Sequence, residues 1–287
     1  MKKVKVMLLG SAGMAGHVLK YELQKISNII ELVDVARSSE LIRPKIEMDV
    51  TDFMNLEKII NEGDFDFLIN CVGVLNDFAE NNSDQAILVN AYLPHFLERI
   101  TKKSSTRIIQ LSTDCVFSGA KGGYNEADLK DGIGFYGQSK ALGELDNDKD
   151  LTIRTSIIGP DLSKKGLGLF NWFINQKGII YGYTKTYWSG VTTLQLAKSV
   201  IEIILYKEKL TGIVHLTNNE KISKYSLLII IQQVFKKDQI KIAQSKIYKV
   251  DKSLVNTRND MKIAIPTYYQ MIEEMKQWME SFKLNFI

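Results

Sequence analysis

The sequence predicts an α/β protein built on a doubly wound parallel sheet. Apolar, strand-like runs alternate with amphipathic helical stretches along the first half of the chain, as expected when each strand is followed by a helix that covers the sheet. The first run, Val4–Leu9, is continuously apolar, which is typical of a central parallel strand covered on both faces. It is followed at once by a glycine-rich turn, Gly10–Gly16, and a helical pattern.

Hydrophobic periodicity places the elements of this first half in order. The expected strands are Val4–Leu9, Ile29–Ala36, Ile46–Asp49, Phe67–Val72, Arg107–Ser112 and Leu151–Ile158. The expected helices are Met14–Leu23, Phe53–Asn61, Ala86–Lys102 with a kink at Pro94, and Tyr136–Glu144.

Beyond Gly159-Pro160 the alternation loosens, and glycine and aromatic residues gather between Gly166 and Gly190, as in loops that form the wall of a pocket. Further elements are expected at Thr192–Tyr206, Ile213–Leu216, Lys221–Phe235 and Tyr268–Phe282, the second being a strand that can rejoin the main sheet. We therefore predict a first domain over residues 1–160 and a smaller, discontinuous lobe over 161–287, from which about 191–217 return to the first domain.

The composition is that of a globular protein of 287 residues, with 45% hydrophobic residues and a net charge of +4 from 37 basic and 33 acidic side chains. This balance, with scattered Lys and Arg, argues against nucleic acid as a partner. Cys71 and Cys115 lie inside apolar runs and are expected to be buried, reduced thiols, and three distant histidines predict no metal site. No apolar stretch reaches the length of a membrane span, so we expect a cytoplasmic protein.

The glycine turn is the first motif that carries chemistry. Glycines between a strand and a helix let the backbone approach a pyrophosphate, and the free N–H groups of the helix N-terminus bind its charge. The turn therefore predicts a Rossmann-type dinucleotide site at Gly10, Ala12, Gly13 and Met14. An ordinary tight turn is the alternative.

The end of the second strand selects the dinucleotide. A carboxylate there binds the ribose 2′-hydroxyl of NAD, whereas an Arg accommodates the 2′-phosphate of NADP. If the strand ends at Ala36, then Asp34 lies before the end, and Arg37 and Ser38 face the phosphate. This register favours NADPH, and a shift of two residues would favour NADH. Asp49-Val50, after the third strand, lies where an adenine edge could be recognised.

Tyr136 and Lys140 lie one helical turn apart on the same helix face. A phenol is a poor acid at neutral pH unless a nearby cation lowers its pKa, and Lys140 is placed to do this while binding the nicotinamide ribose. A third hydroxyl, from Ser112 or Thr113 at a strand end, would hold the substrate carbonyl oxygen. These groups predict hydride transfer to or from a carbonyl, although such a pair also occurs by chance.

Several motifs together resemble the extended short-chain dehydrogenase/reductase family, and within it the dTDP-4-dehydrorhamnose reductase group. They are Leu111-Ser-Thr-Asp-Cys-Val-Phe-Ser-Gly119, Tyr124-Asn-Glu126, Tyr136-Gly-Gln-Ser-Lys140 with Gly143-Glu144, Leu68-Ile-Asn-Cys-Val-Gly73, and Val89-Asn90 followed by Pro94. The resemblance covers residues 1–160 well. It is looser in the C-terminal half, at Tyr187-Trp-Ser-Gly-Val-Thr-Thr193 and at Asp251-Lys-Ser-Leu254 with Arg258. Cys115 replaces the usual aromatic residue, and the usual proline before Tyr136 is absent.

The resemblance implies Thr113 as the hydroxyl partner, Tyr136 as the acid and Lys140 as its modulator. The glycine turn, the ends of the second and third strands, and the motifs of the resemblance together give the predicted cofactor-binding residues. They are Gly10, Ala12, Gly13, Met14, Arg37, Ser38, Asp49, Val50, Cys71, Val72, Gly73, Asn90, Tyr136 and Lys140. The predicted substrate-binding residues are Asp114, Val116, Phe117, Trp188 and Arg258.

The first functional hypothesis is an NADPH-dependent reductase of a nucleotide-linked 4-keto-6-deoxy sugar. An epimerase or dehydratase that regenerates its own cofactor is the alternative within the family, and the lack of a Glu after Asp114 speaks against a dehydratase. A third hypothesis is a non-catalytic regulatory subunit, like the methionine adenosyltransferase β subunit of similar fold. The assembly expected of such a chain is a homodimer.

Overall fold

The computed structural model describes residues 2–37, 42–162, 168–205 and 210–282. Its strands are β1 (Val4–Leu9), β2 (Ile30–Ala36), β3 (Ile46–Glu47), β4 (Phe67–Asn70), β5 (Arg107–Ser112), β6 (Leu151–Arg154), β7 (Ile157–Ile158), β8 (Gly178–Tyr183), β9 (Thr186–Trp188), β10 (Val191–Thr192), β11 (Gly212–His215), β12 (Ile222–Ser223), β13 (Ile240–Ser245) and β14 (Val250–Asp251).

Its α-helices are α1 (Met14–Lys25), α2 (Phe53–Gly63), α3 (Asn76–Asn81), α4 (Ser83–Ala86), α5 (Leu93–Thr101), α6 (Phe135–Leu142), α7 (Leu169–Ile174), α8 (Thr193–Leu205), α9 (Lys224–Phe235) and α10 (Tyr268–Ser281). A π-helix, η1 (Ile87–Tyr92), joins α4 to α5, and a 3₁₀ turn, η2 (Asp114–Val116), follows β5. No helix in these described ranges is long and apolar enough to cross a membrane.

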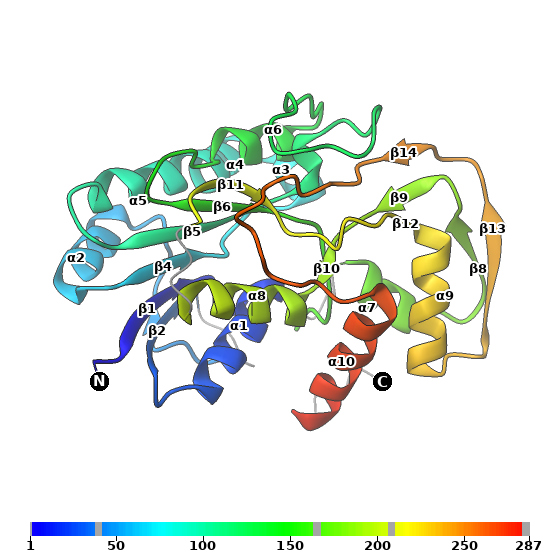
Figure 1. Ribbon diagram of the computed structural model, residues 1–287, viewed down its shortest axis with the longest axis horizontal. Coiled ribbons are helices and arrows are strands. Elements are labelled where there is room, and N and C mark those ends of the chain that lie inside the picture. Colours follow the sequence, from blue (N-terminus) through cyan, green and yellow to red (C-terminus); the bar gives the residue numbers. More distant parts are fainter. Residues whose placement is uncertain (1, 38–41, 163–167, 206–209, 283–287) are drawn as a thin grey trace.

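A seven-stranded sheet in the order β11-β6-β5-β4-β1-β2-β3 forms the centre of the molecule, and every neighbouring pair of strands is parallel. The strand order reverses between β1 and β4, so the predicted doubly wound fold is confirmed, including the return of β11 to the sheet. Helices α1 and α8 cover one face and α2, α4 and α5 the other (Figure 1). Ligands of such sheets bind at the carboxyl ends of the strands beside this reversal.

Side chains of β1 belong alternately to two hydrophobic clusters, one on each face of the sheet, because successive residues of a strand point to opposite faces. Val6 and Leu8 belong to one cluster, and Met7 and Leu9 belong to the other. The first cluster continues without a break through α8 into the C-terminal lobe, where α9 and α10 supply most of its remaining members. The lobe is therefore packed on the same core as one face of the sheet. The division of the chain into two domains stays a prediction.

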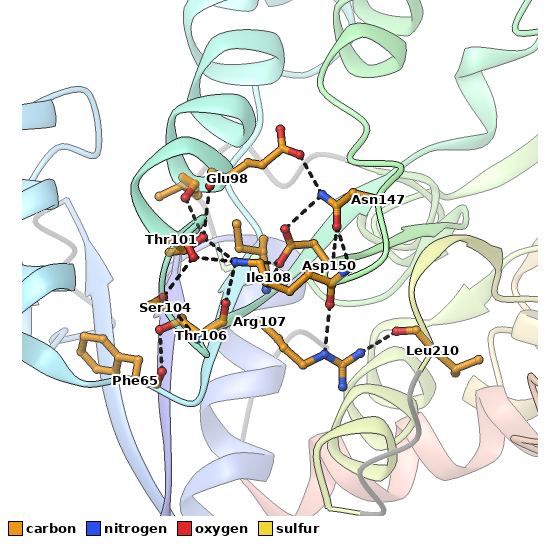
Figure 2. Close-up of polar contacts among 12 residues, drawn as sticks. Phe65, Glu98, Thr101, Ser104, Thr106, Arg107, Ile108, Asn147, Asp150 and Leu210 are labelled. Atoms are coloured by element: carbon orange, nitrogen blue, oxygen red, sulfur yellow. Dashed lines mark hydrogen bonds and ion pairs between the residues drawn. The ribbon is translucent and has the colours of Figure 1, made fainter.

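The amino ends of the strands, opposite the ligand-binding edge, are held by a polar network (Figure 2). Asp150 accepts a hydrogen bond from the backbone N–H of Ile108 at 2.8 Å and another from the Asn147 amide at 3.1 Å. Arg107 donates to the carbonyl oxygen of Leu210 at 2.6 Å. These bonds join the start of β5 to the segments before β6 and β11. The carboxyl ends of the strands, at the opposite edge of the sheet, take no part in this network.

The expected helix over Ala86–Lys102 forms, but its irregularity is not a kink at Pro94. The π-helical segment η1 precedes the proline, which lies in the first turn of α5. Pro94 lacks the N–H that would bond to the carbonyl of Asn90 in a regular α-helix, and the wider turn accommodates this loss.

Asp34 is buried within β2 and forms an ion pair with Lys20 of α1, with 2.8 Å between Nζ and Oδ2. Lys20 also donates to the carbonyl of Arg43, and the N–H of Lys45 donates to Asp34 at 3.1 Å. The pair thus fixes the chain that leads from residue 42 into β3.

We expect Lys20→Met to lower the free energy of unfolding by about 3–5 kcal/mol, because it leaves Asp34 charged and unpaired in the interior. Chemical denaturation measures the change. The control is Lys198→Met, which breaks an exposed pair with Glu274 and should cost less than about 1 kcal/mol. Equal effects of the two substitutions would contradict a structural role for the buried pair.

Candidate active site

The glycine turn lies at the carboxyl end of β1, beside the reversal of strand order. Gly10 has φ = +84°, which side chains rarely adopt. A Cβ atom on Gly16 would lie 2.0 Å from the carbonyl oxygen of Gly10, so glycine is required there for the helix to pack against the turn. A Cβ on Gly13 would meet only ordinary contact, and this residue faces solvent.

The N-terminus of α1 fits an anionic ligand. Gly13 is its N-cap, no side chain caps the helix, and its first turn holds no acidic residue. The N–H of Gly13 donates to the carbonyl oxygen of Gly10 at 3.0 Å, whereas the N–H groups of Ala12 and Met14 have no partner among the described residues and are open to a pyrophosphate. This arrangement suits the predicted dinucleotide.

The register of β2 matches the one that favours NADPH. The strand ends at Ala36. Asp34 lies before this end and forms an ion pair with Lys20, away from the carboxyl edge of the sheet. Arg37 is exposed just past the strand end, whereas Ser38 lies outside the described residues. Asp49 follows β3, and its carboxylate accepts hydrogen bonds from the backbone N–H and hydroxyl of Thr51 at 2.9 and 2.7 Å.

These two bonds hold the pKa of Asp49 below its usual value, and the positive charge of Arg37 adds to the effect. The carboxylate of Asp49 is therefore charged at neutral pH and lies within electrostatic reach of Arg37. Val50, the next residue, is buried.

The segment after β4 touches the glycine turn. A Cβ on Gly10 would lie 3.0 Å from a methyl group of Val72 and 3.2 Å from the carbonyl carbon of Cys71. Cys71 and Cys115 are only partly buried, unlike the expectation, because both lie at this edge rather than inside the sheet. Burial still raises the pKa of the Cys71 thiol to about 12, so it is protonated.

Asn90 of η1 links this segment to the helix that carries Tyr136 and Lys140. Its amide oxygen accepts from the N–H of Val74 at 2.8 Å, and its amide nitrogen donates to Ser139 Oγ of α6 at 3.0 Å. Gly73, next to Val74, lies beside the Asn90 oxygen, and a Cβ there would be 3.5 Å away. The π-helix thus directs one side chain to both halves of the site.

Ser112 and Thr113, the two candidate hydroxyls at the end of β5, differ in their partners. Ser112 donates to Glu144 at 2.6 Å in the interior. Thr113 accepts from the N–H of Cys115 at 3.1 Å and donates its hydroxyl to Asp114 at 3.2 Å, and it lies near enough to the Tyr136 phenol to act against the rise in its pKa. Of the two hydroxyls, Thr113 is therefore the one that lies beside the phenol, and its role as the hydroxyl partner stays a prediction.

Lys140 is buried on α6, one turn from Tyr136, and donates to the carbonyl of Leu111 at 2.6 Å. Burial lowers the pKa of Lys140 to about 8, against the attraction of Glu144 and Cys71. The ammonium is charged at neutral pH, although it titrates within reach of mildly alkaline conditions.

The expected lowering of the Tyr136 pKa by Lys140 is not what the structure shows. Burial raises the pKa of Tyr136, and the nearby Cys115 and Asp114 add to this, while Thr113 only opposes it. Lys140 is directed to Leu111 instead. The phenol is therefore a protonated group, able to give a proton to an oxygen held beside Thr113.

The predicted substrate residues divide into two groups. Asp114 lies in η2 directly after Thr113, at the site. Val116 and Phe117 are fully buried, and the Phe117 ring stacks on Tyr124 with 4.2 Å between centroids. Their side chains therefore support the turn at Asp114–Val116 from the interior.

Trp188 is also buried, with its ring centroid 5.6 Å from that of Tyr268 and 5.3 Å from the ammonium of Lys224. Arg258 donates to the carbonyls of Thr211 and Ile213 at the start of β11. The structure does not bring it to the carboxyl edge where Thr113 lies.

Two positioning residues were missed from the sequence. Glu80 of α3 accepts from the N–H of Tyr136 at 3.1 Å and so fixes the start of α6, a contact that no spacing could reveal. Arg154 at the end of β6 binds Glu144 through two bonds of 2.7 and 2.8 Å. A charged residue inside an apolar strand was the available signal for Arg154.

The fold and this site together define a short-chain dehydrogenase/reductase, in which a Tyr and a Lys on one helix lie beside a dinucleotide turn. Within that class the chain belongs to the family described as the RmlD substrate binding domain, whose model matches residues 4–261.

Curated relatives match part of the chain. It is 30% identical over 137 residues to the probable low-salt glycan biosynthesis reductase Agl14 of Haloferax volcanii, covering 47% of this chain and 46% of the relative. It is 38% identical over 104 residues to dTDP-4-dehydrorhamnose reductase of Mycobacterium tuberculosis, covering 34% of each. The chain thus spans less than half the length of these relatives.

Solved structures match nearly the whole chain. A hypothetical dTDP-4-dehydrorhamnose reductase from Sulfolobus tokodaii is 28% identical, with a TM-score of 0.74 over 92% of this chain and 96% of that one. A dTDP-4-dehydrorhamnose reductase from Bacillus anthracis, in complex with NADP, is 20% identical with a TM-score of 0.81 over 96% and 100%. The second likeness concerns the fold alone.

We expect Arg37→Ala to weaken NADPH binding about ten- to a hundredfold and to leave NADH binding nearly unchanged, because a charge-assisted contact with the 2′-phosphate contributes about 1.5–3 kcal/mol. Fluorescence titration with both dinucleotides measures this, and Arg99→Ala, an exposed change on α5, is the control. Equal affinity of the unmodified chain for both cofactors, with no effect of Arg37→Ala, would contradict the preference.

We expect the affinity for NADPH to be constant from pH 6 to 7.5 and to fall above about pH 8, as Lys140 loses its proton and its hold on the ribose. Titrations at a series of pH values measure the dissociation constant. In Lys140→Met the affinity should be weaker and independent of pH over this range. Equal affinity of the unmodified chain at pH 7 and 9.5 would exclude this role for Lys140.

Proposed function

We propose that the chain is an NADPH-dependent reductase of a nucleotide-linked 4-keto-6-deoxy sugar. The observation that carries the proposal is the placement of Thr113 near a protonated Tyr136, one helical turn from Lys140 and beside the N-terminus of α1. The family membership supports it, as do the names of relatives that reduce dTDP-linked keto sugars.

When bound, NADPH supplies the hydride that reduces the sugar carbonyl. The N-terminus of α1 would hold the pyrophosphate, Arg37 the 2′-phosphate, and Lys140 the nicotinamide ribose. Asp49, Val50 and the turn after β4 would enclose the adenine side.

Thr113 and Tyr136 act on the substrate oxygen. Thr113 orients the carbonyl through its hydroxyl, and Tyr136 transfers its phenolic proton to that oxygen as negative charge develops. The raised pKa of Tyr136 suits this direction, because it keeps the proton on the phenol until the alkoxide forms. Asp114, next to Thr113, is placed to contact a neighbouring sugar hydroxyl.

The alternatives differ in measurable ways. An epimerase or dehydratase would cause no net oxidation of NADPH, and the Asp114-Cys115 pair offers no second carboxylate for elimination. A regulatory subunit would turn over no keto sugar and would copurify with a larger enzyme. We further propose that the protein acts in the cytoplasm and supplies a deoxysugar for glycan synthesis; homodimer formation stays a prediction.

We expect Tyr136→Phe to lower kcat for NADPH oxidation with dTDP-4-keto-6-deoxyglucose by at least a hundredfold, because the proton donor is removed. The dissociation constant of NADPH should change little. The decrease in NADPH absorbance measures the rate, and Tyr181→Phe, an exposed tyrosine of β8, is the matched control. Full activity of Tyr136→Phe would disprove the assigned role.

A further inference from the structure

Three short strands of the C-terminal lobe bring two lysines to one place. Strand β9 is central, with β12 antiparallel on one side and β14 parallel on the other. Ser223 is paired with Tyr187, and Asp251 is paired with the same residue from the opposite side. Lys224 and Lys252 each follow directly after these strands, so they flank β9 from both sides.

Both lysines approach the turn that carries the catalytic hydroxyl. Lys224 lies over Trp188 and within electrostatic reach of Asp114 and Cys115, and Lys252 is within the same reach of Cys115. The peptide next to Lys252 is fixed to this turn, because the N–H of Asp251 donates to the carbonyl of Gly119 at 2.9 Å.

Neither ammonium has a hydrogen-bond or ion-pair partner among the described residues. The contrast is Lys221 of the same lobe, which is paired with Asp251 at 2.7 Å. Burial lowers the pKa of Lys224, which the charges of Asp114 and Cys115 oppose. Both lysines are partly buried, and a cation that has lost part of its water without gaining a partner is costly, so a ligand that supplies anionic oxygens would relieve this cost.

We infer that Lys224 and Lys252 form the subsite for the diphosphate of the nucleotide sugar. This rests on the proposed function, because a diphosphate is the anion that joins the sugar to the nucleoside in such a substrate. The first turn of the 12-residue helix α9 begins at Lys224; Ser223 caps the N–H of Ser226, and the positive end of the helix dipole adds to the potential at Lys224. Two cations balance the two charges of a diphosphate.

The test uses the full chain saturated with NADP, so that the dinucleotide site is closed to the probes. Calorimetric titrations with dTDP, UDP and thymidine compare ligands with and without a diphosphate. We expect both diphosphates to bind at least a hundredfold more tightly than thymidine. Lys224→Met and Lys252→Met should each weaken dTDP about tenfold, and the double variant about a hundredfold, with no change in thymidine or NADP binding.

Lys241→Met, an exposed change on β13, is the control and should leave every titration unchanged. Thermal unfolding of each variant checks that the lobe remains folded, and Lys224→Arg should restore most of the dTDP affinity. Equal binding of dTDP and thymidine, or full dTDP affinity in the double variant, would overturn the subsite.

The two proposals fail separately. Selective dTDP binding that depends on both lysines, without NADPH oxidation by any keto sugar, would support the subsite and reject the reductase. Turnover of dTDP-4-keto-6-deoxyglucose with an unchanged KM in the double variant would support the reductase and reject the subsite.

Discussion

The buried ion pair between Glu144 and Arg154 is the interaction on which the site depends. Burial alone would raise the pKa of Glu144, but the bonds and charge of Arg154, together with Ser112 and Lys130, bring it below its usual value. The carboxylate is therefore charged in the interior, next to the end of β5. Because removal of one member of such a pair leaves an unpaired charge, each partner requires the other.

This pair also reaches the second half of the chain. The guanidinium of Arg154 lies over the Phe117 ring at 5.2 Å and contacts His215 of β11 at 3.2 Å. His215 in turn bonds to the carbonyl of Val255 at 3.0 Å. One charged network thus joins the end of β5, the chain just after α6, and strands β6 and β11 to the segment after β14, so it ties the turn at Thr113 to the C-terminal lobe.

The sequence predicted those features that depend on residues close together in the chain. The end of β2 at Ala36 and the glycine turn could be read from the sequence, because apolar runs and backbone sterics decide them. The sequence also suggested Thr113 together with Tyr136, once the motifs were compared with a family. The π-helix around Asn90 could not be predicted, since a proline in a helical pattern permits either a kink or a wider turn.

Side-chain contacts between residues far apart in the sequence could not be predicted from local patterns. Three examples are the burial of Trp188, the hydrogen bond from Lys140 to Leu111 and the hydrogen bond from Ser112 to Glu144. Each depends on residues that lie far apart in sequence. The pKa of Tyr136 is one example, because its sign depends on burial by several segments rather than on the lysine one turn away.

The core shared by α1, α8 and the C-terminal lobe limits how a chain of this kind can change during evolution. Exchange of the whole lobe would expose the apolar face of α8, so the lobe cannot be replaced as an independent module. The loops after β9 and β14 carry few members of that core, whereas α9, which begins directly after β12, carries many. Substitutions in these two loops can therefore change the surface of the lobe while the Gly10–Gly16 turn and Tyr136 remain in place.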